Sequence, residues 1–146
     1  MANLKLAYSN ATSLTVTGLN SLANQSTATS DAVDNTTNLY LDYLVEVSIA
    51  DVAEAGSNTV FVYAISSVDG TNYSDLQSTN LSAPAVVGAV PCRGAGTWRS
   101  RAMSVAAAFG GSLPPKFKLV IYNDLGVTLA SSGNSVQYVG TYLTST

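Results

Sequence analysis

An alternation of apolar and polar side chains over residues 39–49, LYLDYLVEVSI, constrains the fold more than any other feature of the sequence. One set of alternate positions is entirely apolar and consists of Leu39, Leu41, Tyr43, Val45, Val47 and Ile49. Side chains with a period of two share one face of an extended strand, whereas a helical period of 3.6 would scatter them around the axis. The segment therefore predicts a half-buried β-strand, with Asp42, Glu46 and Ser48 on its polar face.

Other segments also have strand patterns. Residues 59–67 are apolar on both faces and rich in β-branched and aromatic side chains, which predicts a central strand. Shorter alternations occur at 3–8, where Leu4, Leu6 and Tyr8 share a face, and at 13–17, 116–122 and 135–143. Turn-forming clusters separate them, including a tight-turn signal at Asp69-Gly70.

About eight strands at regular spacing, without an amphipathic helix, predict an all-β fold: an antiparallel two-sheet sandwich, jelly-roll-like. The length of 146 residues fits a single β-sandwich domain spanning 1–146. Helical turns are expected at most at 21–26 and 104–109, and a loop or single helical turn at 50–58. Residues 68–96 are expected to form a long surface connection with one short strand inside it.

Charge and composition exclude several classes of partner. Charged residues make up 10% of the chain, against about 25% in typical soluble domains. The net charge of −3 gives no general attraction to nucleic acid or to an anionic membrane surface. The first residues, MANLKLAYSN, lack the basic and apolar regions of a signal peptide, and no apolar stretch approaches the roughly 20 residues that span a bilayer.

The side chains used in neutral-pH catalysis are scarce. Histidine is absent, which removes Ser-His-Asp and Cys-His systems and imidazole zinc sites. Cys92 is the single cysteine and is expected to be a buried, inert thiol. GAGTWR lacks the third glycine of a dinucleotide-binding loop, and the prolines of FGGSLPPK remove donors that a phosphate would need. We therefore expect no enzyme, no metal and no cofactor, although a carboxylate pair in a cleft would reopen the question.

The segment DGTNYSD, residues 69–75, gathers oxygen ligands that calcium could use on Asp69, Asn72 and Asp75. It does not match the EF-hand loop, which needs acids at alternate positions and a distant glutamate. A turn held by side-chain hydrogen bonds from Asp69 is the favoured interpretation, with a calcium site as the alternative.

All three arginines, Arg93, Arg99 and Arg101, lie within residues 88–105 beside the single tryptophan, Trp98. If TWRSRAMSV is a strand, Trp98, Ser100 and Ala102 share the face that enters the core, and Arg99, Arg101 and Met103 share the other. The two arginines would then stand about 6–7 Å apart and need an anion between or beside them.

Two kinds of anion remain open for these arginines. Within the chain, Asp42 and Glu46 are candidate partners, and arginines that are merely solvated belong to the same interpretation. Outside it, a carboxylate on a neighbouring subunit would serve, because the guanidinium group binds carboxylates with two parallel hydrogen bonds.

Three segments resemble small virion structural proteins of tailed bacteriophages of the capsid decoration, or cement, type: residues 38–49, 60–75 and 104–142. The last is the most specific. It carries Phe109-Gly110-Gly111, Leu113-Pro114, Asn123, Gly126, Ala130, Gly133-Asn134 and Tyr138-Val139-Gly140-Thr141-Tyr142. The first thirty residues and residues 91–101 fall outside the resemblance.

The resemblance implies a protein on the outer capsid surface of a virion, made in the host cytoplasm without a signal peptide, that bridges neighbouring major capsid proteins. Copies of itself, as a dimer or trimer, are the second expected partner; nucleic acid and membrane are not expected. The expected partner contacts are the chain termini together with Arg93, Arg99, Arg101, Asp69, Asn72, Tyr73 and Asp75.

A different class of function, a tail- or fibre-associated module that recognises host surface glycan, is the alternative. Exposed coplanar tyrosine or tryptophan rings would favour that alternative, and burial of Trp98 would count against it.

Overall fold

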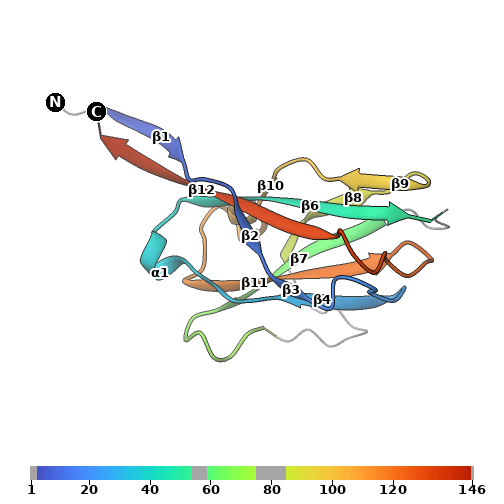
Figure 1. The fold of residues 1–146 in the computed structure, drawn as a ribbon. Helices are drawn as coiled ribbons and strands as arrows, with labels where there is room; N and C mark the ends of the chain where they lie inside the picture. The colour runs from blue at the N-terminus through green and yellow to red at the C-terminus, as the bar shows by residue number, and fades with distance from the viewer. Residues whose placement is uncertain (1–2, 54–58, 75–84, 146) are drawn as a thin grey trace.

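The computed structural model describes residues 3–53, 59–74 and 85–145, and within them the chain forms two antiparallel β-sheets packed face to face (Figure 1). This confirms the predicted all-β two-sheet sandwich. The first sheet contains β1 (Leu4–Tyr8), β2 (Thr12–Leu14), β6 (Asp42–Val52), β9 (Gly96–Arg99), β10 (Met103–Ser104) and β12 (Ser135–Ser145). The second contains β3 (Val16–Thr17), β4 (Ser26–Ser30), β5 (Val33–Asp34), β7 (Thr59–Ser67), β8 (Ala85–Pro91) and β11 (Lys116–Asp124). Two short helices are α1 (Asn35–Asn38) and α2 (Val105–Ala108).

Several of these strands are parts of longer, interrupted ones. β1 and β2 both pair with β12, and the chain then crosses to the other sheet as β3. β4 and β5 both pair with β11, and β9 and β10 both pair with β6. When β1, β2 and β3 are counted together as the first strand, the described chain has eight strands. Their order is first-eighth-third-sixth in one sheet and second-seventh-fourth-fifth in the other, with β3, the end of the first strand, beside the second. This is the strand order of a jelly roll.

The core lies between the two sheets and follows the predicted alternation. Tyr43 and Val47 of β6 have no exposed surface, and Phe117 of β11 is 1% exposed. The rings of Tyr43 and Phe117 meet edge to face, with centroids 5.2 Å apart, and so join the two sheets. β7 occupies residues 59–67, as the sequence predicts, and is central because β11 and β8 pair with its two edges.

The strand predicted to begin at residue 39 begins at Asp42 instead. Leu39 is the C-cap of α1 with a φ of 51°, and the Asn35 side chain bonds both the backbone N–H and the carbonyl of Tyr40. This turn takes residues 39–41 out of the line of the strand. Leu39 and Leu41 are therefore exposed rather than part of the core, and the prediction for these two side chains is wrong.

The predictions for the helical turns had mixed outcomes. The turn expected at 104–109 is α2, whereas residues 21–26 contain no helix. In the segment 50–58, β6 continues to Val52 and residues 54–58 lie outside the described part of the chain.

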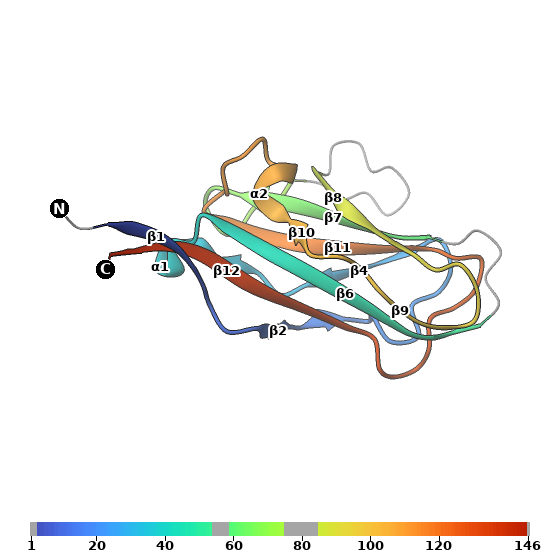
Figure 2. The same ribbon diagram turned by 90° about the horizontal axis from the view of Figure 1, so that it is seen from above.

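A two-stranded ribbon projects from one end of the sandwich and carries both chain ends (Figures 1 and 2). Leu4–Tyr8 pairs with residues 141–145, whereas β12 pairs with β6 only as far as Thr141. We call residues 4–8 and 141–145 the terminal arm.

Candidate interaction surfaces

Two sheet edges meet along one long side of the sandwich (Figure 2). β8 is the last described strand of its sheet, and β9 and β10 are the last of the other. The groove here has a volume of about 960 Å³, and its lining includes Phe61, Ala89, Pro91, Arg99, Arg101 and Ala102. We call it the arginine groove.

A β-bulge at Ser100 shapes this groove. Trp98 lies opposite Ile49 and Met103 opposite Val45, so the outer strand has one residue more than its partner strand over this stretch. Ser100 fills the gap: its N–H donates to the Val47 carbonyl, and its Oγ accepts from the Val47 N–H, both at 2.9 Å.

The bulge overturns part of the predicted alternation. Met103 is buried in the core instead of sharing an exposed face with the arginines, and Ala102 is exposed instead of entering the core. Trp98 packs against the core from a half-buried position, and its Nε1 donates to the Gly94 carbonyl at 2.9 Å.

Arg99 has an internal partner. Its Nε lies 3.6 Å from Oε1 of Glu46, and that oxygen also accepts from Gln137 at 2.7 Å. Because the Arg99 side chain is 64% exposed, this pair contributes little to stability. Asp42, the other candidate partner, accepts instead from the N–H of Ala106 at 2.8 Å. The internal prediction is thus confirmed for Glu46 and wrong for Asp42.

Arg101 and Arg93 have no carboxylate partner in the described residues, where the ion pairs are Arg99–Glu46 and Lys116–Asp34. Arg101 lines the arginine groove with Arg99, whereas Arg93 is exposed on the connection between β8 and β9 and does not line it. Beside Arg93, Cys92 is fully buried, and burial raises the pKa of its thiol to about 11. The predicted burial of this thiol is confirmed.

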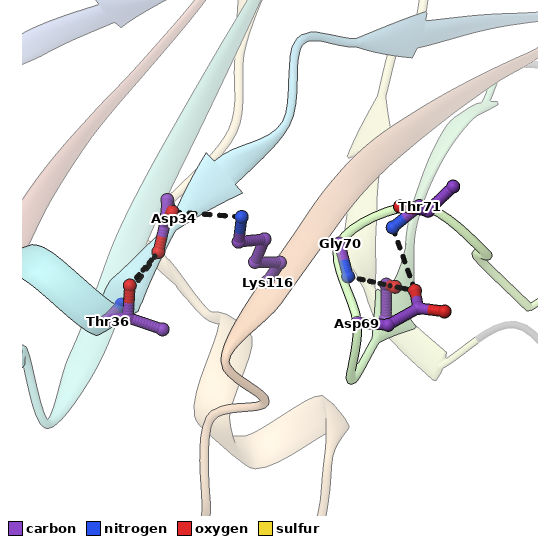
Figure 3. A network of polar contacts seen from close by, with 7 residues as sticks. Asp34, Thr36, Asp69, Gly70, Thr71 and Lys116 are labelled. Atoms are coloured by element: carbon purple, nitrogen blue, oxygen red, sulfur yellow. Dashed lines mark hydrogen bonds and ion pairs between the residues drawn. The ribbon is translucent and has the colours of Figure 1, made fainter.

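Asp69 organises a separate turn (Figure 3). Its Oδ1 accepts from the N–H groups of Asn72 and Thr71 at 2.8 Å and from Oγ of Ser67 at 2.9 Å, and its Oδ2 accepts from the Asn72 amide at 2.8 Å. These bonds, first that from the Asn72 backbone, hold the pKa of the carboxyl well below its ordinary value. The predicted side-chain-bonded turn is confirmed.

Lys116 lies beside this turn and covers Gly70 (Figure 3). Its Nζ is 3.2 Å from Oδ2 of Asp34. Asp34 also caps α1 by accepting from the N–H and hydroxyl of Thr36, and these bonds lower the pKa of its carboxyl.

The remaining predicted contact residues do not join the groove. Nζ of Lys118 lies over the Tyr73 ring, 4.5 Å from the ring centroid. The Tyr73 hydroxyl is buried without a hydrogen-bond partner in the described structure. Asp75 lies outside the described residues. The structure thus brings Arg99 and Arg101 together in one place, and Asp69 and Asn72 in another.

The terminal arm and the adjoining residues form a second surface. Seven of the nine exposed large hydrophobic residues of the described chain lie here: Leu4, Leu6, Tyr8, Leu39, Leu41, Tyr142 and Leu143. We call these seven the arm patch. The last four also line a hollow of about 540 Å³ at the base of the arm. The alternation placed Leu4, Leu6 and Tyr8 on one face, but gave no signal that their strand leaves the sandwich.

In residues 3–53, 59–74 and 85–145, no three acidic or cysteine side chains gather closely enough to hold a metal ion. Within the same part of the chain, no helix has the length and apolar character needed to cross a membrane.

No protein-family model matches the chain, and no curated protein matches it. Among solved structures, a chain from Desmodium yellow mottle tymovirus aligns with 100% of this chain and 89% of its own length, at 10% identity and a TM-score of 0.37. An exo-β-1,3-galactanase from Phanerochaete chrysosporium with galactose aligns with 97% of this chain and 29% of its own length, at 8% identity and a TM-score of 0.29. Likenesses this weak carry no argument about function.

Proposed function

We propose that this chain is a structural virion protein of the capsid decoration type, which attaches to the outside of a capsid and strengthens contacts between major capsid proteins. The observation that carries the proposal is the arginine groove. In it, Arg101 lacks a carboxylate partner among the described residues and stands beside a free sheet edge.

The free edge itself supports docking of an extended segment. β8, AVVGAVP, has no charged side chain, although natural edge strands are commonly protected by charges. An extended partner segment can add to such an edge through main-chain hydrogen bonds, and a carboxylate on it can bind the two guanidinium groups. We infer that the groove receives an extended, acidic segment of the capsid surface.

The mechanism requires no chemistry beyond binding. A protein that binds the assembled capsid better than the free subunits stabilises the assembly by its binding free energy. The jelly roll suits this role because it is a rigid two-layer scaffold, and it occurs in both viral capsid and lectin domains. The fold alone does not distinguish a capsid role from a lectin role. The resemblance of three sequence segments to decoration proteins favours the capsid role.

The test is the occupancy of purified capsids by the variant carrying both Arg99→Glu and Arg101→Glu. Reversal of both charges is expected to abolish most of the binding, since like charges would then face the partner's carboxylate. The matched variant Arg93→Glu changes the same residue type outside the groove and is expected to lose less. Full occupancy by the double variant would remove the groove from the interface.

Glycan recognition by a tail- or fibre-associated module is a second candidate, favoured by one observation. Phe61, Tyr63 and Tyr122 form a row of nearly parallel rings on the outer face of the second sheet, with centroids 6.2 and 6.5 Å apart and interplanar angles of 28°. The half-buried Trp98, whose Nε1 is already bonded, counts against it. Specific binding on an array of host surface glycans, lost in Tyr122→Ala, would favour this function over the first.

A further inference from the structure

The terminal arm is a part of the surface that the arginine groove does not use. Among the described residues, β1 pairs only with β12, and residues 142–145 of β12 pair only with β1, so both long edges of the ribbon are unpaired. A two-stranded ribbon is marginally stable by itself in water, and a third strand or a packed face is needed to fix it.

One face of the terminal arm carries exposed apolar side chains. Leu4 is 67% exposed, Leu6 53% and Tyr8 57%. Leu143 pairs with Leu6 and so lies on the same face of the ribbon as these three side chains, whereas Tyr142 pairs with Ala7 and lies on the other face. Exposed apolar side chains gathered on one face of the arm mark an interaction site in a chain that is otherwise rich in polar side chains.

We propose that the arm binds the arm of a second copy, by antiparallel pairing of β1 with β1 of that copy about a two-fold axis at Leu6. In this register Leu6 faces Leu6, Leu4 faces Tyr8 and Lys5 faces Ala7. All five residues of β1 are used, and the apolar face of one arm continues into that of the other.

Charge supports this occupant and this register. Lys5 is the only charged residue of the arm, since residues 141–145 are TYLTS. An axis at Lys5 would place two lysines opposite each other, which destabilises a strand pair, whereas the axis at Leu6 separates them. The same lysine disfavours insertion of the arm into the arginine groove of another copy, where Arg99 and Arg101 would repel it.

Sedimentation velocity on the purified chain tests the association. The wild type is expected to be a dimer, and Leu6→Glu a monomer, because two carboxylates would meet at the axis. Leu6 is half exposed, so the fold should persist, and an unchanged unfolding midpoint will verify this. Val68→Glu is the control: Val68 is 88% exposed and is not part of the terminal arm, so this variant should stay a dimer. A monomeric or trimeric wild type, or a dimeric Leu6→Glu, overturns the proposal.

Disulfide trapping tests the register. On mild oxidation, Leu6→Cys should give a covalent dimer, because the residue on the axis faces its own copy. Lys5→Cys, which faces Ala7, should react far less. The native Cys92 is buried and adds little background. Equal trapping at both positions, or none at position 6, contradicts an axis at Leu6.

These experiments need no capsid, so they stand apart from the proposed function. The variant with both Arg99→Glu and Arg101→Glu should remain a dimer even if it no longer occupies capsids.

Discussion

The terminal arm has unpaired strand edges and the arginine groove holds Arg101 without a carboxylate partner in the described chain, but the two regions differ in what holds them in place. The arm rests on one strand pairing, on the Ser9–Gly140 hydrogen bonds and on Tyr40 at its base. The groove is built on the body of the sandwich, where Ser100 and Met103 are buried. Contacts between apolar side chains are not directional, whereas a guanidinium group binds a carboxylate in a fixed geometry. These properties suit the two proposed roles, self-association through the arm and binding of a capsid carboxylate in the groove.

The largest effect is expected from a methyl group at the base of the arm. In Gly140→Ala, the added Cβ would overlap the ring of Tyr40, which is held against Tyr43 with ring centroids 5.2 Å apart. Overpacking against so constrained a ring should cost about 3 kcal/mol, visible as a lower urea midpoint.

Gly88→Ala is the matched change beside the groove. There the added Cβ would meet the sulfur of Met103, a flexible side chain that can move aside. This variant should therefore lose clearly less stability than Gly140→Ala. Equal losses of unfolding free energy in the two variants would show that the side chains around Gly140 are no more rigid than those around Gly88.

A smaller loss is expected when the bulge is weakened. Ser100→Ala removes the acceptor of the buried Val47 N–H, which should cost about 1–3 kcal/mol of unfolding free energy. It should also reduce capsid occupancy, because the bulge positions Arg99 and Arg101, while leaving the arm dimer intact. Ser9→Ala, which removes a part-buried hydrogen bond at the arm base, should cost less. A Ser100→Ala protein of full stability would contradict the role given to the bulge.

Ionic strength should affect binding through the two surfaces differently. Raising the ionic strength from about 0.05 to 0.5 M shortens the Debye length several-fold and should weaken binding through the arginine groove. The arm dimer, which depends on apolar contacts and one lysine per copy, should keep its sedimentation coefficient. If the dimer dissociates with salt while capsid occupancy does not change, the assignments of the two surfaces are reversed.

The smallest effect concerns the Asp69 turn. Because the pKa of its carboxyl is lower in the folded chain, Asp69 stabilises the fold above its ordinary pKa of about 3.9, and this contribution is lost as pH falls through the folded value. The difference in urea midpoint between wild type and Asp69→Ala should therefore be larger at neutral pH than in strong acid. A difference that grows on acidification would contradict this sign.

The sequence predicted what depends on local pattern. Residues 59–67 form a strand within the predicted bounds, and Phe117, Leu119 and Ile121 are buried opposite two lysines, because alternation reports directly which face meets the core. The Asp69 turn was predictable for a similar reason, since its hydrogen bonds span at most three residues.

The remaining features depend on contacts that local pattern does not encode. The bulge at Ser100 requires Val47, which is 53 residues away, and without that partner the alternation of the arginine segment is misread. Leu6 has the pattern of a core residue, but its strand runs past the end of β6, where no opposing sheet covers it. Strand ends and bulges, and with them both candidate surfaces, are set by tertiary pairing.

The central claim, adhesion to a capsid as a structural component of the virion, is tested most directly by stoichiometry. Quantitative mass spectrometry of purified virions that contain this chain would give its copy number relative to the major capsid protein. The account predicts a copy number of the same order as that of the major capsid protein. A handful of copies per particle would place the chain on the tail and contradict the account.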